Sequence, residues 1–143
     1  LLPYSDVILP NLTEMYLRVA AAFVVGNSDM HLKNFSLIEN MPGSRIFQLS
    51  KAYDMLPVNV IMPEDKEQMA LTINGKKRNI HKKEFRKLAE SYEISPKAAE
   101  NMLKKICRME NKLLDQVEGA YLSKEQKEQV SQLVHERIKT LSL

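Results

Sequence analysis

Apolar residues recur at helical spacing near the start of the chain, over residues 12–23, and this period predicts an amphipathic helix. The helix is expected to begin close to Asn11, because its side chain can cap the first turn while Glu14, three residues on, completes a capping box. Gly26 provides a permissive stop. The chain then enters the polar residues 27–29, which are therefore predicted to lie on a loop held by a buried helix.

The middle of the chain changes to short apolar runs. Two such runs around a Pro-Gly turn predict a β-hairpin over residues 35–49. Because a hairpin brings its two ends together, Asn34 before it and Asp54 after it are expected to be spatial neighbours. Residues 57–67 are predicted to form a loop, and residues 69–76 carry the Asn-Gly pair of a second, tight hairpin.

The helical period returns in the second half of the chain. Ser95, followed by a proline at the first helical position, predicts the start of a long helix that ends at Gly119. Ser123 with Gln126 predicts a capping box for a final helix. Before these, one apolar face marks another helix, with Phe85, Leu88, Ala89 and Tyr92. The predicted fold is mainly α with small β-hairpins, an α+β arrangement.

Length and composition indicate one domain over residues 1–143. The single cysteine, Cys107, has no partner within the chain, which is typical of a reducing compartment, so a cytoplasmic location is expected. No stretch approaches the roughly 20 apolar residues of a membrane span, and we expect no membrane partner. The chain starts at Leu1 without a methionine, so it is expected to be a piece of a longer polypeptide.

The net charge of +3 is unevenly spread. Seven basic residues lie between Lys76 and Lys87 against one acid, Glu84. Such a segment could meet phosphate backbones or an acidic protein surface. The favoured interpretation is a set of solvated loop and helix faces.

One motif points to chemistry. Asp29 and Asn34 stand five residues apart, and Asp54 follows beyond the predicted hairpin. Phosphoryl-transfer enzymes use this spacing to orient a hydroxyl group and to hold Mg²⁺. Asp29 suits the first task as an exposed loop carboxylate, whereas Asn34 and Asp54 offer the hard oxygen ligands that Mg²⁺ prefers.

His31 within this motif has two interpretations. It stands two places after Asp29, where many protein kinases have a lysine that reaches the transferred phosphate, so an imidazole there is a candidate for the same electrostatic task. Alternatively, His31 holds the loop by bonding backbone groups. A metal site made of His31 and the two aspartates competes with both.

Three stretches resemble the C-terminal domain of HipA-like kinases, the toxins of bacterial toxin–antitoxin systems. They read GNSDMHLKNFS over residues 26–36, LSKAYDMLP over residues 49–57 and LTINGK over residues 71–76. The resemblance implies the helical C-terminal lobe of a protein-kinase-like fold that uses ATP and Mg²⁺ to phosphorylate a protein serine or threonine. By the same similarity Asp29 is the catalytic residue, and Asn34 and Asp54 are the Mg²⁺ ligands.

The resemblance also implies partners and a role. Family members are known to phosphorylate aminoacyl-tRNA synthetases and arrest growth, and a small helix-turn-helix antitoxin holds them, so DNA would be met only through the antitoxin. A Gly-rich phosphate loop and a strand lysine would belong to an N-terminal lobe that this chain lacks, so this chain alone is predicted to be inactive. Asp54 is followed by Met-Leu instead of the Phe-Gly of ordinary protein kinases, so their activation-segment logic does not transfer.

Two other functions compete with a protein kinase. Phosphoinositide-kinase-like enzymes and small-molecule phosphotransferases use related arrangements of carboxylate and amide groups. A non-catalytic binding module would instead use basic side chains as a docking surface. In the predicted long helix these would share one face, with Lys97, Lys104, Arg108 and Lys112.

Overall fold

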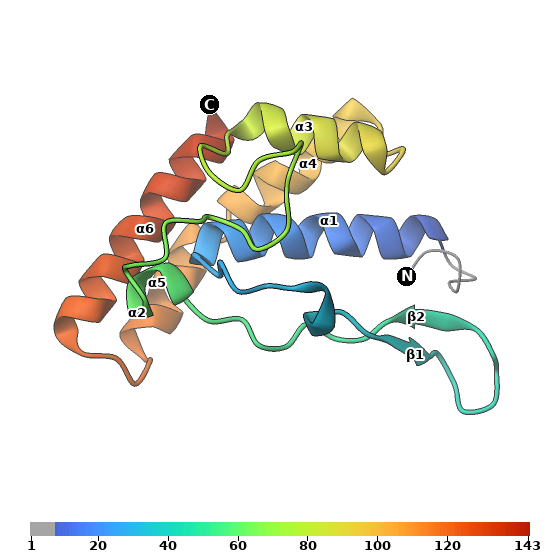
Figure 1. The fold of residues 1–143 in the computed structure, drawn as a ribbon, viewed down its shortest axis with the longest axis horizontal. Coiled ribbons are helices and arrows are strands. Elements are labelled where there is room, and N and C mark those ends of the chain that lie inside the picture. Colours follow the sequence, from blue (N-terminus) through green and yellow to red (C-terminus); the bar gives the residue numbers. More distant parts are fainter. Residues whose placement is uncertain (1–7) are drawn as a thin grey trace.

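The computed structural model describes residues 8–143 (Figure 1). In this range the chain is mostly helical and has one two-stranded antiparallel sheet, which agrees with the predicted α+β class. In chain order the elements are α1 (Ile8–Val25), the 3₁₀ helix η2 (Leu32–Asn34), β1 (Leu37–Glu39), β2 (Phe47–Leu49), α2 (Val58–Ile61), α3 (Lys82–Ser91), α4 (Pro96–Cys107), α5 (Glu110–Glu118) and α6 (Lys124–Ser142).

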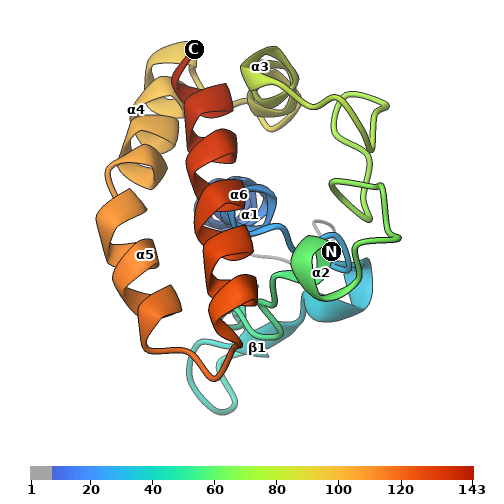
Figure 2. The same ribbon diagram turned by 90° about the vertical axis from the view of Figure 1, so that its left-hand side faces the viewer.

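The core forms around α1, which packs against α3, α4 and α6. Figure 2 shows α1 nearly end-on behind α6. Three fully buried rings join α1 to α3, because Phe85 meets Tyr16 and Phe23 edge-on at centroid distances of 6.4 and 5.3 Å. Such aromatic contacts add to the stabilisation from buried apolar area. The C-terminal end of α1, where the motif begins, is therefore fixed in the core.

The start of α1 differs from the prediction. In the described part of the chain α1 already runs from Ile8, so Asn11 lies inside the helix and not at a cap position. Pro10 is tolerated because the amide groups of a first helical turn have no acceptor within the helix. Asn11 is buried, and its Oδ1 accepts a hydrogen bond from the backbone amide of Leu49 at 3.0 Å. Glu14 pairs with Arg18, one turn further along the helix, at 2.7 Å.

The end of α1 is as predicted. Gly26 has a φ of +74°, and its amide bonds to the carbonyl of Phe23. The amide of Asn27 bonds to the carbonyl of Ala22 at 2.8 Å. These two bonds form a Schellman motif, which satisfies the last helical carbonyls and requires a left-handed residue where glycine stands.

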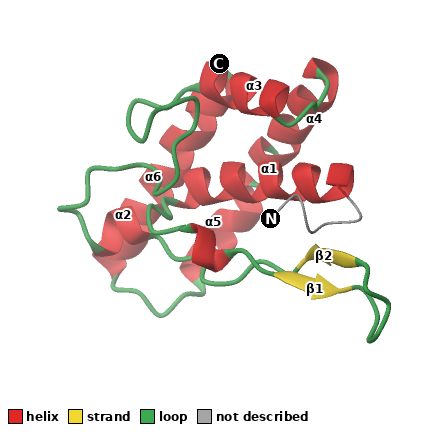
Figure 3. Cartoon of the chain, turned by 45° about the vertical axis from the view of Figure 1, so that its right-hand side comes forward, coloured by secondary structure: helices red, strands yellow, loops and turns green. Residues whose placement is uncertain are grey.

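The first hairpin is confirmed and the second is only partly formed. Strands β1 and β2 pair in antiparallel register, with Leu37 opposite Leu49, and Figure 3 shows them beside the helices. At the second position Asn74 and Gly75 both have positive φ, as a tight type I′ turn requires. The flanking residues make a single bridge, Ile73 to Lys76, and no named strand.

Two other predicted boundaries are wrong. The predicted loop over residues 57–67 contains α2, which begins where the Pro57 carbonyl accepts bonds from the amides of Val60 and Ile61. The predicted long helix is divided into α4 and α5 at residues 108–109, where the amide of Met109 bonds to the carbonyl of Ile106, only three residues back. Among the described residues, no helix combines the length and apolar character needed to cross a membrane.

The predicted helix caps of the second half are present. Ser95 accepts a hydrogen bond from the amide of Ala98 and starts α4. Ser123 and Gln126 form both bonds of a capping box at the start of α6. The basic face expected on one long helix is interrupted at Arg108, the residue that caps α4.

Candidate active site

The motif loop, residues 27–34, leaves α1 directly from the buried helix end. Two apolar side chains anchor it, since Met30 and Phe35 are 1% and 5% exposed. Within the loop the amide of His31 bonds to the carbonyl of Asp29, and η2 closes the loop at Asn34. The loop thus holds its backbone in place while the Asp29 side chain stays more than half exposed.

Asn34 and Asp54 are in direct contact. Asn34 Nδ2 donates to Asp54 Oδ2 at 2.7 Å, across a sequence separation of 20 residues. The predicted proximity of these two side chains is therefore confirmed, and the β1–β2 hairpin between them is the cause.

The other end of the Asn34 amide is unusual. Asn34 is 4% exposed, and its Oδ1 atom is buried without a hydrogen-bond partner in the described structure. Leaving a buried acceptor unpaired costs about 1–3 kcal/mol. An amide oxygen in this state beside an exposed carboxylate is a donor set that suits Mg²⁺. The residues present therefore fit the ion that the motif predicts.

Asp29 and His31 form a second pair. His31 Nε2 lies 2.8 Å from Asp29 Oδ1, and both side chains are about half exposed. When Nε2 carries its proton, it donates to the carboxylate and fixes its orientation. This contact favours an orienting role for His31, through Asp29 itself and not through backbone groups.

The competing metal site of His31 with both aspartates is not formed. Over residues 8–143 no three His, Cys, Asp or Glu side chains gather closely enough to hold a metal ion. The side-chain contacts explain this, because His31 engages Asp29 whereas Asp54 engages Asn34.

The backbone of Asp54 is held in an uncommon conformation. Its φ is +57°, in the left-handed region that few non-glycine residues adopt. Asn27, which is 1% exposed, donates from Nδ2 to the carbonyl oxygen of Asp54 at 3.0 Å. Asn27 was not among the predicted site residues, because its only signal in the sequence is its place as a polar residue directly after the helix-ending glycine.

Further contacts hold the segment that leads from β2 to Asp54. Tyr53 donates its hydroxyl to the carbonyl of Lys33 at 3.1 Å. Ser50 bonds to Ser36 through both backbone and hydroxyl, and Arg18 of α1 donates to the Ser50 carbonyl. None of these residues stood out in the sequence, because each acts on a backbone atom or side chain far along the chain.

Ser28 links the motif loop to the segment after α2. Its hydroxyl donates to Asp65 Oδ2 at 2.5 Å. This bond, followed by one from the Glu67 amide, holds the pKa of the Asp65 carboxyl below its usual value. The motif loop is therefore braced on two sides, at Asp54 and at Asp65.

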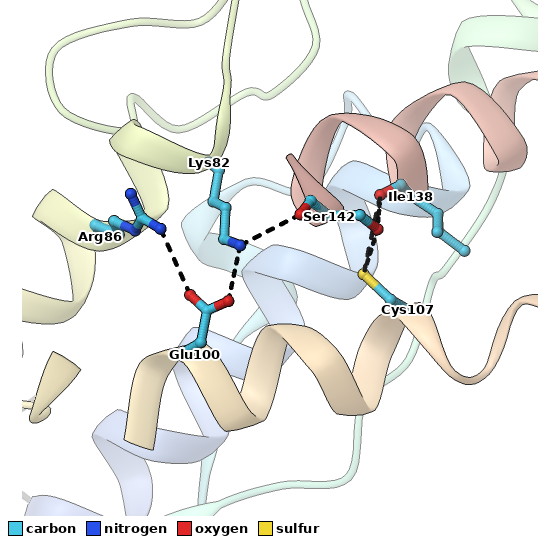
Figure 4. A network of polar contacts seen from close by, with 6 residues as sticks. All are labelled: Lys82, Arg86, Glu100, Cys107, Ile138 and Ser142. Atoms are coloured by element: carbon cyan, nitrogen blue, oxygen red, sulfur yellow. Dashed lines mark hydrogen bonds and ion pairs between the residues drawn. The ribbon is translucent and has the colours of Figure 1, made fainter. Parts of the chain in front are cut away.

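The basic segment between Lys76 and Lys87 is largely neutralised. Five of its seven cations meet acids, and two of these acids, Glu67 and Glu100, come from other segments: Lys76 with Glu84, Lys77 with Glu67, Lys82 and Arg86 with Glu100, and Lys87 with Glu90. Figure 4 shows Lys82 and Arg86 converging on Glu100, while the half-buried Cys107 lies further along α4, against Ser142 and Ile138. These pairs support the interpretation of a solvated, structural surface over that of a nucleic-acid docking site.

Comparisons with known proteins place the chain in a family. A family model described as HipA-like C-terminal domain matches residues 5–113. A curated protein of Sinorhizobium fredii (strain NBRC 101917 / NGR234), named "Putative kinase Y4dM", is 36% identical over 88 residues. The match covers 61% of this chain and 21% of that protein, so the chain aligns with about a fifth of its relative's length. This chain belongs to the family of HipA-like C-terminal domains.

Proposed function

We propose that this chain is the catalytic lobe of a HipA-like serine/threonine kinase that transfers the γ-phosphoryl group of ATP to a protein hydroxyl. The observation that carries the proposal is the Asn34–Asp54 contact at 2.7 Å, with the unpaired Oδ1 of Asn34 beside it. Membership of the family and the kinase name of the relative support the same reaction class.

Each site residue has a distinct proposed task. Asp29 is exposed on the rigid motif loop, where it accepts a hydrogen bond from the acceptor hydroxyl and orients its oxygen toward the phosphorus. His31 fixes the Asp29 carboxylate. Asn34 through Oδ1 and Asp54 through its carboxylate would hold Mg²⁺, which when bound neutralises charge on the phosphates.

The family resemblance supports a wider proposal. The acceptor is a protein of the translation machinery such as an aminoacyl-tRNA synthetase, phosphorylation arrests growth in the bacterial cytoplasm, and a helix-turn-helix antitoxin restrains the kinase. The ion pairs along residues 76–87 support contact with DNA only through that antitoxin. Assays of the complete protein with labelled ATP and protein, lipid or small-molecule acceptors test the substrate class, and transfer to a lipid or metabolite alone would refute it.

Two substitutions in the complete protein test the division of roles. Asp54→Asn should abolish most of the thermal stabilisation by nucleotide with Mg²⁺, because it removes a charged ligand. Asp29→Asn should preserve that stabilisation and lower turnover by about 10²–10⁴-fold. Asp115→Asn, an exposed site on α5, is the control and should change neither quantity. Equal loss of nucleotide binding in both site variants would refute the assignment.

A further inference from the structure

We infer that Asn27 is a positioning residue for Asp54: its buried side-chain amide holds the left-handed backbone that directs the Asp54 carboxylate to Asn34. The role of Asp54 toward Mg²⁺ rests on the proposed function. The arrangement of Asn27 and Asp54 rests only on the described contacts.

The backbone of Asp54 needs an external restraint. A left-handed conformation costs most L-residues about 1–2 kcal/mol and an aspartate less, because its short polar side chain tolerates it; Asp54, with a φ of +57°, is also exposed. Packing of its own side chain therefore does not impose this conformation. Strained residues of this kind persist where surrounding structure over-determines them.

Asn27 supplies the restraint from a fixed position. Its own amide completes the Schellman motif of α1 by bonding to the carbonyl of Ala22 at 2.8 Å. The residue is 1% exposed, so its side chain has little freedom. From this point Nδ2 reaches the carbonyl oxygen of Asp54 at 3.0 Å and the sulfur of Met55 at 3.7 Å. One amide group thus contacts two consecutive residues of the turn.

The two ends of Asp54 are then held from the same loop. Asn27 holds the main-chain carbonyl, and Asn34 holds the carboxylate at 2.7 Å. If the carbonyl were released, the backbone of Asp54 could relax toward a more favourable φ, and the carboxylate would move away from Asn34. Residues that orient a metal ligand in this way typically change metal affinity by about 10–100-fold when they are replaced.

The test is Asn27→Ala in the complete protein, with Mg²⁺ titrated at a fixed concentration of a fluorescent ATP analogue. We expect the apparent Mg²⁺ affinity to fall by at least about tenfold, while binding of the analogue without Mg²⁺ is unchanged. Amide hydrogen exchange should also accelerate over residues 53–56. Asn59→Ala is the matched control, because Asn59 Nδ2 likewise donates to a backbone carbonyl, that of Glu67, at 2.8 Å. It should lower thermal stability without changing the Mg²⁺ dependence.

The outcomes separate the inference from the proposed function. Suppose that Asn27→Ala binds Mg²⁺ about as tightly as the unaltered protein, whereas Asp54→Asn binds it much more weakly. This result would overturn the role of Asn27 and leave the proposed function standing. No effect of Asp54→Asn would overturn the proposed function, and faster exchange over residues 53–56 in Asn27→Ala would still support the backbone restraint. If Asn27→Ala does not fold, Asn27→Leu keeps the approximate shape, removes the donor without adding a charge, and must show the same loss of Mg²⁺ affinity.

Discussion

Replacing Gly26 with alanine is expected to destabilise the protein at the junction between α1 and the motif loop. Gly26 has a φ of +74°, so any side chain there is strained. A Cβ atom at this position would also lie well within the van der Waals contact distance of Leu133 Cδ2, on α6. Two separate penalties therefore meet at one residue.

The magnitude follows from these two contributions. The left-handed backbone accounts for about 1–2 kcal/mol, and overpacking against Leu133 adds about 1–3 kcal/mol. The free energy of unfolding should therefore fall by about 2–5 kcal/mol in Gly26→Ala. Gly43→Ala isolates the backbone contribution, because Gly43 has a φ of +78° and a methyl group added there would meet nothing within 4 Å.

Urea denaturation of Gly26→Ala, Leu133→Ala and the double variant measures the packing contribution. Shortening Leu133 makes room for the new methyl group, so the double variant should be more stable than the sum of the single effects by about 1–3 kcal/mol. Additivity within about 0.5 kcal/mol would refute the clash. A Gly26→Ala effect no larger than that of Gly43→Ala would lead to the same conclusion.

Three further predictions concern stability. Ser28→Ala should lower the free energy of unfolding by about 1 kcal/mol at pH 7. Because the Ser28 bond lowers the pKa of the folded Asp65 carboxyl, this loss of stability should shrink as pH falls below about 4, and melting curves between pH 7 and 3 measure it. Burial raises the pKa of Glu84, but the hydrogen bond from Lys76 and a backbone amide outweigh it, so the pKa is lowered. Lys76→Ala should therefore destabilise the fold by about 1–3 kcal/mol at pH 7, a value reduced for the partial exposure of Lys76. Urea titrations at pH 4 should show a smaller loss. Asn74→Gly should leave the urea midpoint unchanged or raised, whereas Asn74→Ala should lower stability by about 1 kcal/mol, because φ is +51°; equal midpoints would contradict this.

The sequence predicted features that depend on neighbouring residues. The caps at Ser95 and Ser123 and the stop at Gly26 were correct, because each bond joins residues within a few positions. The contact of Asn34 with Asp54 was predictable for a related reason, since the hairpin between them closes locally.

Features that depend on distant partners were not predictable. Asn11 has a side chain that favours a cap position, yet from inside the helix it accepts a hydrogen bond from the amide of Leu49. The cations of residues 76–87 looked unbalanced because acids such as Glu67 and Glu100 come from other segments. A single sequence without these tertiary contacts therefore overestimates the cap and leaves the partners of these cations undetermined.

Asn27 illustrates the same limit at the site itself. Read locally, it is a polar residue after a helix-ending glycine, and nothing marks it as a partner of Asp54. The structure shows that the helix end that Gly26 terminates also fixes Asn27, and that Asn27 bonds to the Asp54 carbonyl. Because Asn34 follows seven residues later on the same loop, both contacts to Asp54 depend on where α1 ends. The position of the predicted Mg²⁺ ligands is thus set by the packing of α1 in the core, and a substitution at that helix end, such as Gly26→Ala, should disturb the site as well as lower the stability of the fold.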